Sequence, residues 1–444
     1  MNKQALKNAG IKFIRIVWCD NANIIRAKVA HINYLDDLIE NGVGITVAQQ
    51  ALPVMSDSVV PETGLGPVGE VRLMPDRSTL TFLPYANGHA QVISDMVVSV
   101  TGKRWEHCPR AFLRRQIEKL MDKGLILKAA FENEFFLLRR TAEGALEPTD
   151  ETVFSATGSI NQHQAFINDL TDALNVQGVS VEGYYPESAP GQQEVNVHYA
   201  DAMRAADQQI IYRETVRGVA TQHGIIASFL PKIFEDKAGS GCHINFSFWR
   251  KGENISGDPQ QSDGIGQEAA AFIAGVLAHL PALAAITIPS KTSYRRIKPH
   301  FWAGAFRSWG YQNREAAVRV CANQDGTRAS RFELKTADAS SNPYLALGSL
   351  IAAGLDGLQR NLELPEQVTV DPGLIPEEER RTKGIDLLPQ NLGESIKLLH
   401  KNEVLLEAMG TALAKSFLAV RQCEWDALKD MSFEEEVALL VERY

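Results

Sequence analysis

LKAAFENEFFLL, residues 127–138, places two glutamates inside an otherwise apolar and β-favouring run. No helical period fits the run, so it predicts an extended strand in which alternate side chains share a face. Glu132 and Glu134 then point the same way, and two neighbouring carboxylates are costly to bury without a cation or an arginine to neutralise them. The pair indicates a divalent-metal or acid–base site, and this stretch alone leaves a solvated edge strand open as the alternative.

The composition is that of an ordinary globular chain with a large core. Its 444 residues are 45% hydrophobic and 22% charged, which predicts two or three domains. A net charge of -9 argues against a nucleic-acid binder, although a local arginine cluster could still hold an anionic substrate. No apolar targeting segment or long uninterrupted apolar run indicates secretion or a membrane partner, so we expect a cytoplasmic protein. The five cysteines form no CxxC pair, which disfavours disulfides and structural zinc.

The local patterns change near residue 104. Residues 10–100 alternate short β-favouring runs with turns, and one helix is expected around residues 34–40. From residue 110 onward helices and strands alternate, which is typical of an α/β or α+β domain. The predicted helices cover residues 111–120, 162–174, 202–222, 345–358 and 392–419. The predicted strands, besides the opening one, cover residues 179–181, 194–198, 243–248 and 331–335.

Four further acidic or imidazole positions lie beside turn or strand patterns. Glu187 and Glu194 flank a Pro-Gly turn. His243 follows Gly-Ser-Gly, and Glu333 lies in the middle of a predicted strand. A set of carboxylates with one imidazole suits Mg²⁺ or Mn²⁺ better than zinc. Each of these positions, taken alone, is more often structural than functional.

Basic residues gather between residues 295 and 335. They are Arg295, Arg296, Arg314, Arg319, Arg328, Arg331 and Lys335. Guanidinium groups recognise carboxylates and phosphates by geometry as well as charge, whereas the plain alternative is a solvated charged face. The chain has no P-loop and no G-x-G-x-x-G motif, so metals and arginines would have to hold a nucleotide, as in phosphoryl transfer. A thiol nucleophile at Cys242 is the weaker alternative, because a metal-bound His243 could not serve as its base.

Six ordered motifs resemble the glutamine synthetase family over nearly the whole chain. They are Phe131-Glu132-Asn133-Glu134-Phe135, Pro190-Gly191-Gln192-Gln193-Glu194, Gly239-Ser240-Gly241-Cys242-His243, Ser293-Tyr294-Arg295-Arg296, Asn313-Arg314-Glu315-Ala316-Ala317-Val318-Arg319 and Asn342-Pro343-Tyr344-Leu345. The resemblance implies an α+β fold, with a small β-grasp domain over residues 1–103 and a catalytic domain on a curved antiparallel sheet over residues 104–444. It also implies stacked hexameric rings forming a dodecamer, with active sites between subunits.

Carried over position by position, the resemblance implies two metal sites and an ATP-dependent ligation. Mg²⁺ or Mn²⁺ would be held at one site by Glu134, Glu187 and Glu194, and at the other by Glu132, His243 and Glu333. The implied ATP-binding residues are Glu182, Asn245, Ser247, Arg314, Arg319 and Arg328. The implied glutamate-binding residues are Gly239, Arg296, Arg314 and Lys335, with Arg296 and Arg314 also acting on the transferring phosphoryl group. ATP would phosphorylate the γ-carboxylate of L-glutamate, and an amine would then displace phosphate to give a γ-glutamyl amide.

Asn245 and Lys335 replace a family histidine and arginine, and two further departures from the family pattern concern the amine. Trp302, after Pro-His-Phe, stands where ammonia-using members have a flap glutamate, and an indole offers apolar surface instead of charge. The segment that supplies an ammonium-binding aspartate is also absent, and Asp57 is only a weak substitute for it. We therefore expect a small alkylamine as the substrate, methylamine before ethylamine, with Trp302 and Asp57 at the amine site. In this respect the chain is similar to γ-glutamylmethylamide synthetases. The alternatives are ammonia, a bulkier amine, and a catalytically silent regulatory or scaffold relative.

Overall fold

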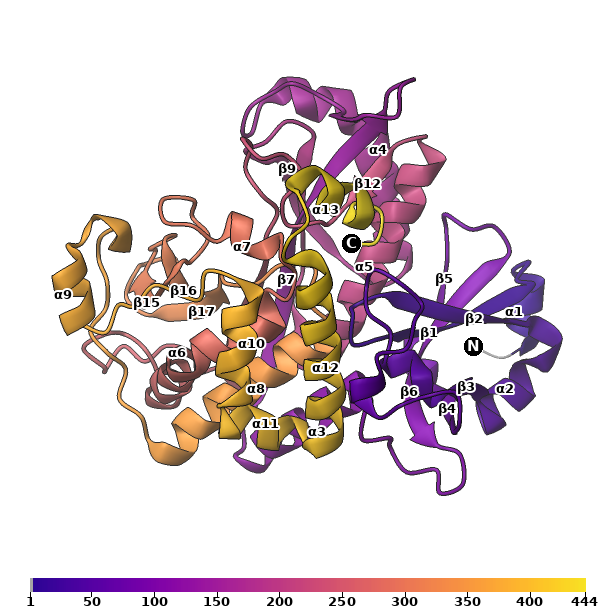
Figure 1. Cartoon of the computed structure of the whole chain (residues 1–444), viewed down its shortest axis with the longest axis horizontal. Helices are drawn as coiled ribbons and strands as arrows, with labels where there is room; N and C mark the ends of the chain where they lie inside the picture. Colours follow the sequence, from indigo (N-terminus) through magenta and orange to yellow (C-terminus); the bar gives the residue numbers. More distant parts are fainter. Residues whose placement is uncertain (1–2) are drawn as a thin grey trace.

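Two sheets and the helices packed on them make up the protein, as a computed structural model shows for residues 3–444 (Figure 1). The smaller, N-terminal sheet has the strand order β2-β1-β6-β4-β3, with β5 beside β6. β1 pairs with β6 in parallel and with β2 in the antiparallel sense. The elements of this part are α1 (Lys3–Asn8), β1 (Phe13–Cys19), β2 (Ile25–His31), α2 (Leu35–Asn41), β3 (Val43–Thr46), β4 (Glu70–Pro75), β5 (Thr81–Phe82) and β6 (His89–Val98).

The larger sheet carries the glutamate pair. Its strands follow the order β15-β16-β17-β13-β7-β10-β9, with β8, β11 and β12 also on β7 and β14 on β13. Its strands are β7 (Ile126–Arg140), β8 (Leu146–Pro148), β9 (Val181–Pro186), β10 (Gln192–Val197), β11 (Ala200–Asp201), β12 (Ile226–Ser228), β13 (Cys242–Arg250), β14 (Glu253–Asn254), β15 (Phe306–Tyr311), β16 (Ala316–Ala322) and β17 (Ala329–Leu334). The predicted antiparallel sheet is confirmed except where β15 and β16 run parallel.

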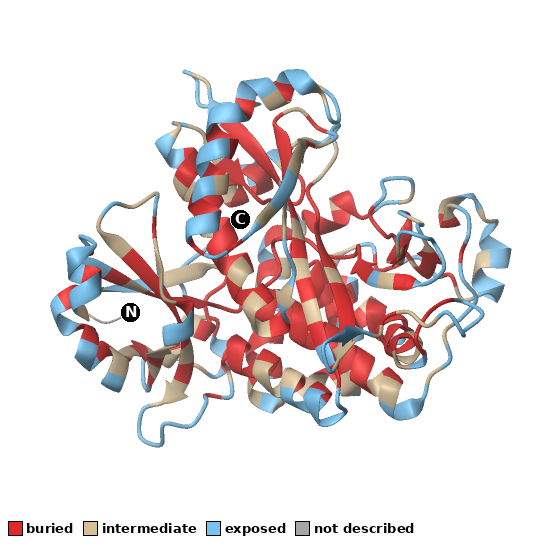
Figure 2. Ribbon diagram, turned by 180° about the vertical axis from the view of Figure 1, so that it is seen from behind, coloured by how far each residue is buried: buried red, intermediate tan, exposed pale blue. Residues whose placement is uncertain are grey.

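Helices surround the larger sheet. They are α3 (Pro109–Asp122), α4 (Thr157–Val176), α5 (Ala202–Gln222), α6 (Gln267–Thr287), α7 (Ser293–Arg296), α8 (Pro343–Arg360), α9 (Glu377–Thr382), α10 (Leu392–His400), α11 (Glu403–Met409), α12 (Thr411–Leu428) and α13 (Phe433–Leu440). Figure 2 shows buried residues running through the sheet and the helices next to it, whereas the outer helices are largely exposed. The α+β class that the sequence predicts is confirmed.

Strand β7 runs through the interior of the larger sheet. It pairs with β13 on one side and with β10 on the other, so the alternative of a solvated edge strand is wrong. Its side chains alternate as predicted: Phe131 and Phe135 are buried in the apolar core, and Glu132 and Glu134 lie on the opposite face. One strand therefore supplies both the core and a polar face.

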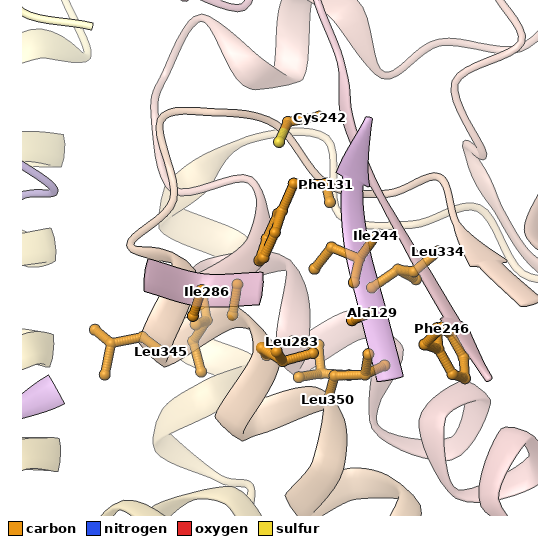
Figure 3. Close-up of a cluster of buried hydrophobic side chains, with 14 of the residues drawn as sticks. Ala129, Phe131, Cys242, Ile244, Phe246, Leu283, Ile286, Leu334, Leu345 and Leu350 are labelled. Carbon is orange, nitrogen blue, oxygen red and sulfur yellow. The ribbon is translucent and has the colours of Figure 1, made fainter. Parts of the chain in front are cut away.

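The apolar face of the sheet packs on helices α6 and α8. Figure 3 shows Phe131 of β7 and Ile244 of β13 in one cluster with Ile286 of α6 and Leu345 of α8. Burying each such side chain stabilises the fold by about 1.5–3 kcal/mol. Because this packing fixes one face of the sheet, it also fixes where the polar side chains on the opposite face can lie.

Helix α6 is absent from the expectations drawn from the sequence. It is buried on nearly all sides, so its apolar residues form no stripe that a helical period would reveal. By length and composition it could cross a membrane, but 78% of its most apolar window is buried inside the protein, where it packs against α8 and α10. We interpret α6 as the central helix of the core.

The single helix predicted over residues 392–419 is wrong. The structure divides this stretch among α10, α11 and α12. Asn402 begins α11 by accepting a hydrogen bond from the backbone N–H of Leu405, and Gly410 separates α11 from α12 with φ of 80°. The strand predicted at residues 179–181 begins only at Val181.

Candidate active site

Strand register brings the predicted metal ligands together. Glu132 lies opposite His243 across β7 and β13, and Glu134 lies opposite Glu194 across β7 and β10. Directly opposed residues in an antiparallel pair have Cβ atoms about 5 Å apart. Glu333 joins them from the next strand, β17, where it lies opposite Asn245 of β13.

Glu132, His243 and Glu333 form the first cluster, which we call the histidine group. His243 Nδ1 lies 3.4 Å from Glu132 Oε1 and 3.2 Å from Glu333 Oε1. Glu333 Oε2 lies 2.9 Å from Arg319 Nη1, and Lys335 Nζ lies 3.4 Å from Glu333 Oε1. Glu333 therefore lies between two cationic side chains and the imidazole, and Glu132 contacts the same imidazole.

Glu134, Glu187 and Glu194 form the second cluster, which we call the triglutamate group. Glu134 Oε2 accepts a hydrogen bond of 2.9 Å from the backbone N–H of Gly241, and the Tyr185 hydroxyl donates one of 2.5 Å to Glu194 Oε1. Neither of these donors carries a formal charge. The three carboxylates thus face one another, and none of them forms an ion pair with an arginine or a lysine among the described residues.

The pKa values reflect this imbalance. Burial, followed by the charges of Glu132 and Glu134, raises the pKa of Glu194 to about 9. Burial, followed by the charge of Glu134, raises the pKa of Glu187 to about 7. The triglutamate group is therefore short of positive charge when all its members are ionised.

The histidine group shows the opposite shifts. Burial opposes ionisation of Glu333, but Lys335 and a hydrogen bond with His243 hold the pKa of Glu333 well below its ordinary value. Burial also opposes ionisation of Glu132, whose pKa is lowered by its hydrogen bond with His243. Although burial and Lys335 act against it, hydrogen bonding to Glu132 and Glu333 raises the pKa of His243 to about 9. A metal ion that bound His243 would have to displace the imidazole proton.

Both groups fit a hard divalent cation. Within each group the ligand atoms lie within 4.8 Å of one another. His243 Nε2 is buried, has no hydrogen-bond partner among the described residues, and lies 3.9 Å from Glu134 Oε1. Carboxylate oxygens with one imidazole are the donors that Mg²⁺ and Mn²⁺ accept, and a cation would relieve the repulsion in the triglutamate group.

A cavity of about 750 Å³, which we call the acidic cavity, opens over the triglutamate group. Its lining includes the four residues predicted to bind glutamate and the residue predicted to cover the amine: Gly239, Arg296, Arg314, Lys335 and Trp302. Gly239 must be a glycine, because a Cβ there would lie 2.4 Å from the carbonyl oxygen of Pro231. Arg296 is oriented by donating from Nη2 to the carbonyl of Ala337 at 2.8 Å.

A second cavity of about 680 Å³, which we call the aromatic cavity, lies on the other side of Glu132. Its lining includes three of the predicted ATP-binding residues: Glu182, Asn245 and Ser247. Glu132 and Tyr185 line both cavities, so they form a shared wall. Asn245 supports this wall by donating to Glu132 Oε2 at 3.0 Å.

Three residues predicted to bind ATP, and Asp57, do not line the cavity in which the other residues of the same predicted role lie. Arg314 lines the acidic cavity and not the aromatic one, and Arg319 contacts Glu333 without lining either cavity. Arg328 is exposed and lines neither cavity. Asp57, with 86% of its side chain exposed, lies 3.3 Å from Arg26 in the N-terminal part and lines neither cavity. Within one chain, Asp57 is therefore not brought to the site.

Apart from Trp302, the aromatic side chains that line the two cavities were not predicted. Tyr199 and Trp249 line the aromatic cavity, where Lys128 Nζ lies 4.0 Å from the Trp249 ring centroid. Phe154 and Phe301 line the acidic cavity beside Trp302. The one available sequence signal is strand alternation, which places Trp249 on the same face of β13 as Ser247.

Cys242 faces away from the site. It is buried, its thiol contacts Asn133 Oδ1 at 3.2 Å, and Figure 3 places it at the edge of the apolar cluster. Burial raises the pKa of its thiol well above the ordinary value. The alternative of a thiol nucleophile is therefore wrong.

Comparison with known proteins agrees with this geometry. The model of the glutamine synthetase catalytic domain matches residues 106–439, and that of the glutamine synthetase N-terminal domain matches residues 3–105. The chain belongs to the glutamine synthetase family. As a member of this family it is an ATP-dependent ligase, and the family uses divalent metal ions.

Individual glutamine synthetase relatives cover nearly the whole chain. Type-1 glutamine synthetase 1 of Dictyostelium discoideum is 33% identical over 99% of this chain and 91% of its own length. Gamma-glutamylpolyamine synthetase GlnA3 of Streptomyces coelicolor is 37% identical over 94% of this chain and 90% of its own length. A solved GmaS/ADP complex superimposes with a TM-score of 0.85 at 26% identity, over 97% of this chain and 96% of that one.

Proposed function

We propose that this glutamine synthetase family member joins the γ-carboxylate of L-glutamate to a small alkylamine, with methylamine favoured and ethylamine accepted. The observation that carries the proposal is that Trp302 lines the acidic cavity. A negatively charged flap residue at this position would favour ammonium, whereas an indole offers apolar surface to an alkyl group. The likeness to GmaS, a gamma-glutamylmethylamide synthetase, supports ligation of an amine in general.

In this proposal ATP occupies the aromatic cavity, and glutamate and the amine occupy the acidic cavity. Divalent ions held by the histidine and triglutamate groups would neutralise the phosphate oxygens. Arg296, Arg314 and Lys335 bind the carboxylates of glutamate and the transferring phosphoryl group, since cationic side chains recognise both. Arg319 acts through Glu333, which it holds in place.

The reaction proceeds in two displacements. A γ-carboxylate oxygen of glutamate attacks the terminal phosphorus of ATP, the bond from that phosphorus to the bridging oxygen breaks, and ADP leaves. The amine nitrogen then attacks the γ-carbonyl carbon, the carbon–oxygen bond to phosphate breaks, and the nitrogen loses one proton. Positioning and charge neutralisation supply most of the catalysis. The wall formed by Glu132 and Tyr185 would hold ATP and glutamate at a fixed distance from each other.

Apolar contact with Trp302 alone does not make a strong preference for methylamine. Burying one methyl group is worth roughly 0.8 kcal/mol, which is only a few-fold in selectivity. A weaker ammonium site must supply the rest. The chain offers no flap glutamate, because Trp302 stands at that position.

Comparison of amines in one assay tests the proposal. The purified protein with ATP, Mg²⁺ or Mn²⁺ and glutamate is given ammonia, methylamine, ethylamine, putrescine, spermidine or aniline, and kcat/KM is obtained for each. We expect methylamine to give the highest value. A clear preference for ammonia would refute the alkylamine assignment.

A polyamine is the second candidate substrate. It is favoured by the 37% identity to the gamma-glutamylpolyamine synthetase and by an acidic cavity of about 750 Å³, which exceeds the needs of glutamate and methylamine. A higher kcat/KM for putrescine or spermidine in the same assay would select this candidate. A catalytically silent relative would release no phosphate from ATP with any amine.

We also propose that the protein acts in the cytoplasm as stacked hexameric rings, a dodecamer, in which active sites lie between subunits. This arrangement would allow Asp57 of one subunit to reach the acidic cavity of its neighbour. Sedimentation or light scattering of the purified protein measures the assembly. If Asp57→Ala lowers activity, mixing those subunits with inactive Glu134→Ala subunits should restore part of it when sites are shared.

A further inference from the structure

The flap that carries Trp302 has an unusual backbone. His300 and Trp302 adopt positive φ angles of 67° and 56°, and Phe301 lies between them. For residues other than glycine this conformation costs free energy and persists only when surrounding contacts hold it. The contacts made by this segment therefore decide where the indole lies.

Glu315 makes one of these contacts from the connection between β15 and β16. Its Oε1 accepts a hydrogen bond of 2.7 Å from the backbone N–H of Trp302. The Glu315 side chain is buried, with the residue only 6% exposed, whereas Trp302 is 61% exposed. Burial raises the pKa of Glu315, and backbone groups of Trp302 and His300 act against that shift. A buried carboxylate is thus directed at the flap backbone.

A second contact holds the other side of Phe301. His300 Nδ1 lies 2.7 Å from Asp371 Oδ2, and Asp371 Oδ1 accepts from the backbone N–H of Gly373 at 2.7 Å. A Cβ on Gly373 would lie 2.6 Å from His300 Cε1, so the flap packs closely on this turn. The two anchors differ: the Asp371 anchor holds the exposed His300 side chain, whereas the Glu315 anchor comes from a buried carboxylate and holds the backbone.

We propose that Glu315 is a positioning residue that holds Trp302 over the acidic cavity through its backbone N–H. This inference rests on the proposed function for the chemistry at that cavity, and it assigns Glu315 no contact with substrate. With the hydrogen bond present, the indole limits which amines enter and keeps water from the acyl phosphate. Without it, the strained flap relaxes, and water attacks the γ-carbonyl carbon, releasing phosphate and regenerating glutamate.

Two substitutions separate positioning from a general structural role. Glu315→Ala removes the acceptor, whereas Glu315→Gln keeps an acceptor oxygen at the same place without the charge. Glu363→Ala, at an exposed glutamate outside both cavities, is the matched control. The assay measures phosphate release from ATP and glutamate without amine, then kcat and KM for methylamine and ammonia.

We expect Glu315→Ala to raise amine-independent phosphate release about tenfold and to increase KM for methylamine about fourfold, with KM for ATP unchanged. Glu315→Gln should stay within about twofold of the unmodified protein in both measurements because the acceptor remains. The proposal is overturned if Glu315→Ala matches Glu363→Ala in both measurements, or if Glu315→Gln is as impaired as Glu315→Ala.

The amine-independent measurement separates this inference from the proposed substrate. If ammonia proves to be the preferred amine, the alkylamine proposal fails, yet Glu315→Ala should still raise phosphate release without amine. If methylamine is preferred and that release stays unchanged, only the positioning role of Glu315 fails. Circular dichroism and thermal unfolding of Glu315→Ala confirm that a folded protein is being compared.

Discussion

Replacing Glu194 by glutamine should stabilise the metal-free protein at neutral and alkaline pH, although it removes one member of the triglutamate group. Glutamine has nearly the same shape, and its carbonyl oxygen can still accept the hydrogen bond that Tyr185 donates to Glu194. What it lacks is the negative charge that Glu132 and Glu134 repel. The substitution therefore isolates the electrostatic cost of holding these carboxylates together.

The magnitude follows from the raised pKa of Glu194, which moves from 4.5 to about 9 on folding. A group with a raised pKa contributes its full stabilisation below pH 4.5 and loses it as the pH rises toward 9. At pH 7 the loss is about 3 kcal/mol, at 1.36 kcal/mol for each pH unit. For a chain of this length that is about 3 °C in Tm. A divalent ion at 100 times its Kd would restore about 2.7 kcal/mol.

Thermal unfolding measures this effect directly. Both proteins are scanned in EDTA at pH 5, 7 and 9, at one protein concentration, and again with excess Mg²⁺ or Mn²⁺. We expect the unmodified protein to lose Tm with rising pH more steeply than Glu194→Gln, and to gain more from metal. Exposed Glu363→Gln serves as the control. Equal pH slopes for the two proteins in EDTA would refute the reasoning.

Four further substitutions test the site. Glu132→Ala and Glu134→Ala should each abolish ligation while leaving the circular dichroism spectrum intact, and near-normal activity in either would rule out the two metal groups. Trp302→Ala should reduce the preference for methylamine over ammonia only a few-fold, since a methyl contact is worth roughly 0.8 kcal/mol. A hundredfold loss of this preference would mean that the indole does more than cover a methyl group. Gly239→Ala should raise KM for glutamate steeply, because its Cβ would meet the Pro231 carbonyl oxygen 2.4 Å away; an unchanged KM would show that the loop moves freely.

Strand periodicity accounts for the first two residues that the sequence assigns to the site. A period of two residues places Glu132 and Glu134 on one face of β7 and Phe131 on the other, and tertiary packing follows the same division. The companions of this pair, including His243 and Glu333, follow from family motifs and not from spacing. They lie on other strands, and the sequence of one strand does not determine which residues of its neighbours lie opposite it.

The failures have physical reasons. Helix α6 is apolar on nearly all sides, so a search for an apolar stripe does not find it. The C-terminal helices share an almost continuous helical pattern, and single residues such as Asn402 and Gly410 divide them. The sequence predicts Asp57 at the amine site, but within one chain Asp57 lies beside Arg26 and outside the acidic cavity. Aromatic residues around the cavities, such as Trp249, resemble core residues until the fold shows which face they line.

Because Glu132 and Glu134 are two residues apart on one strand, covalent geometry sets the spacing between the backbone positions of the histidine group and the triglutamate group. Two residues of extended chain span about 6.6 Å, and this length cannot stretch when loops move or subunits shift. The flap and the surrounding loops can therefore vary without changing the spacing of the two groups. A single-residue insertion between the two glutamates would be worse than either alanine substitution, since it would turn one carboxylate into the apolar core.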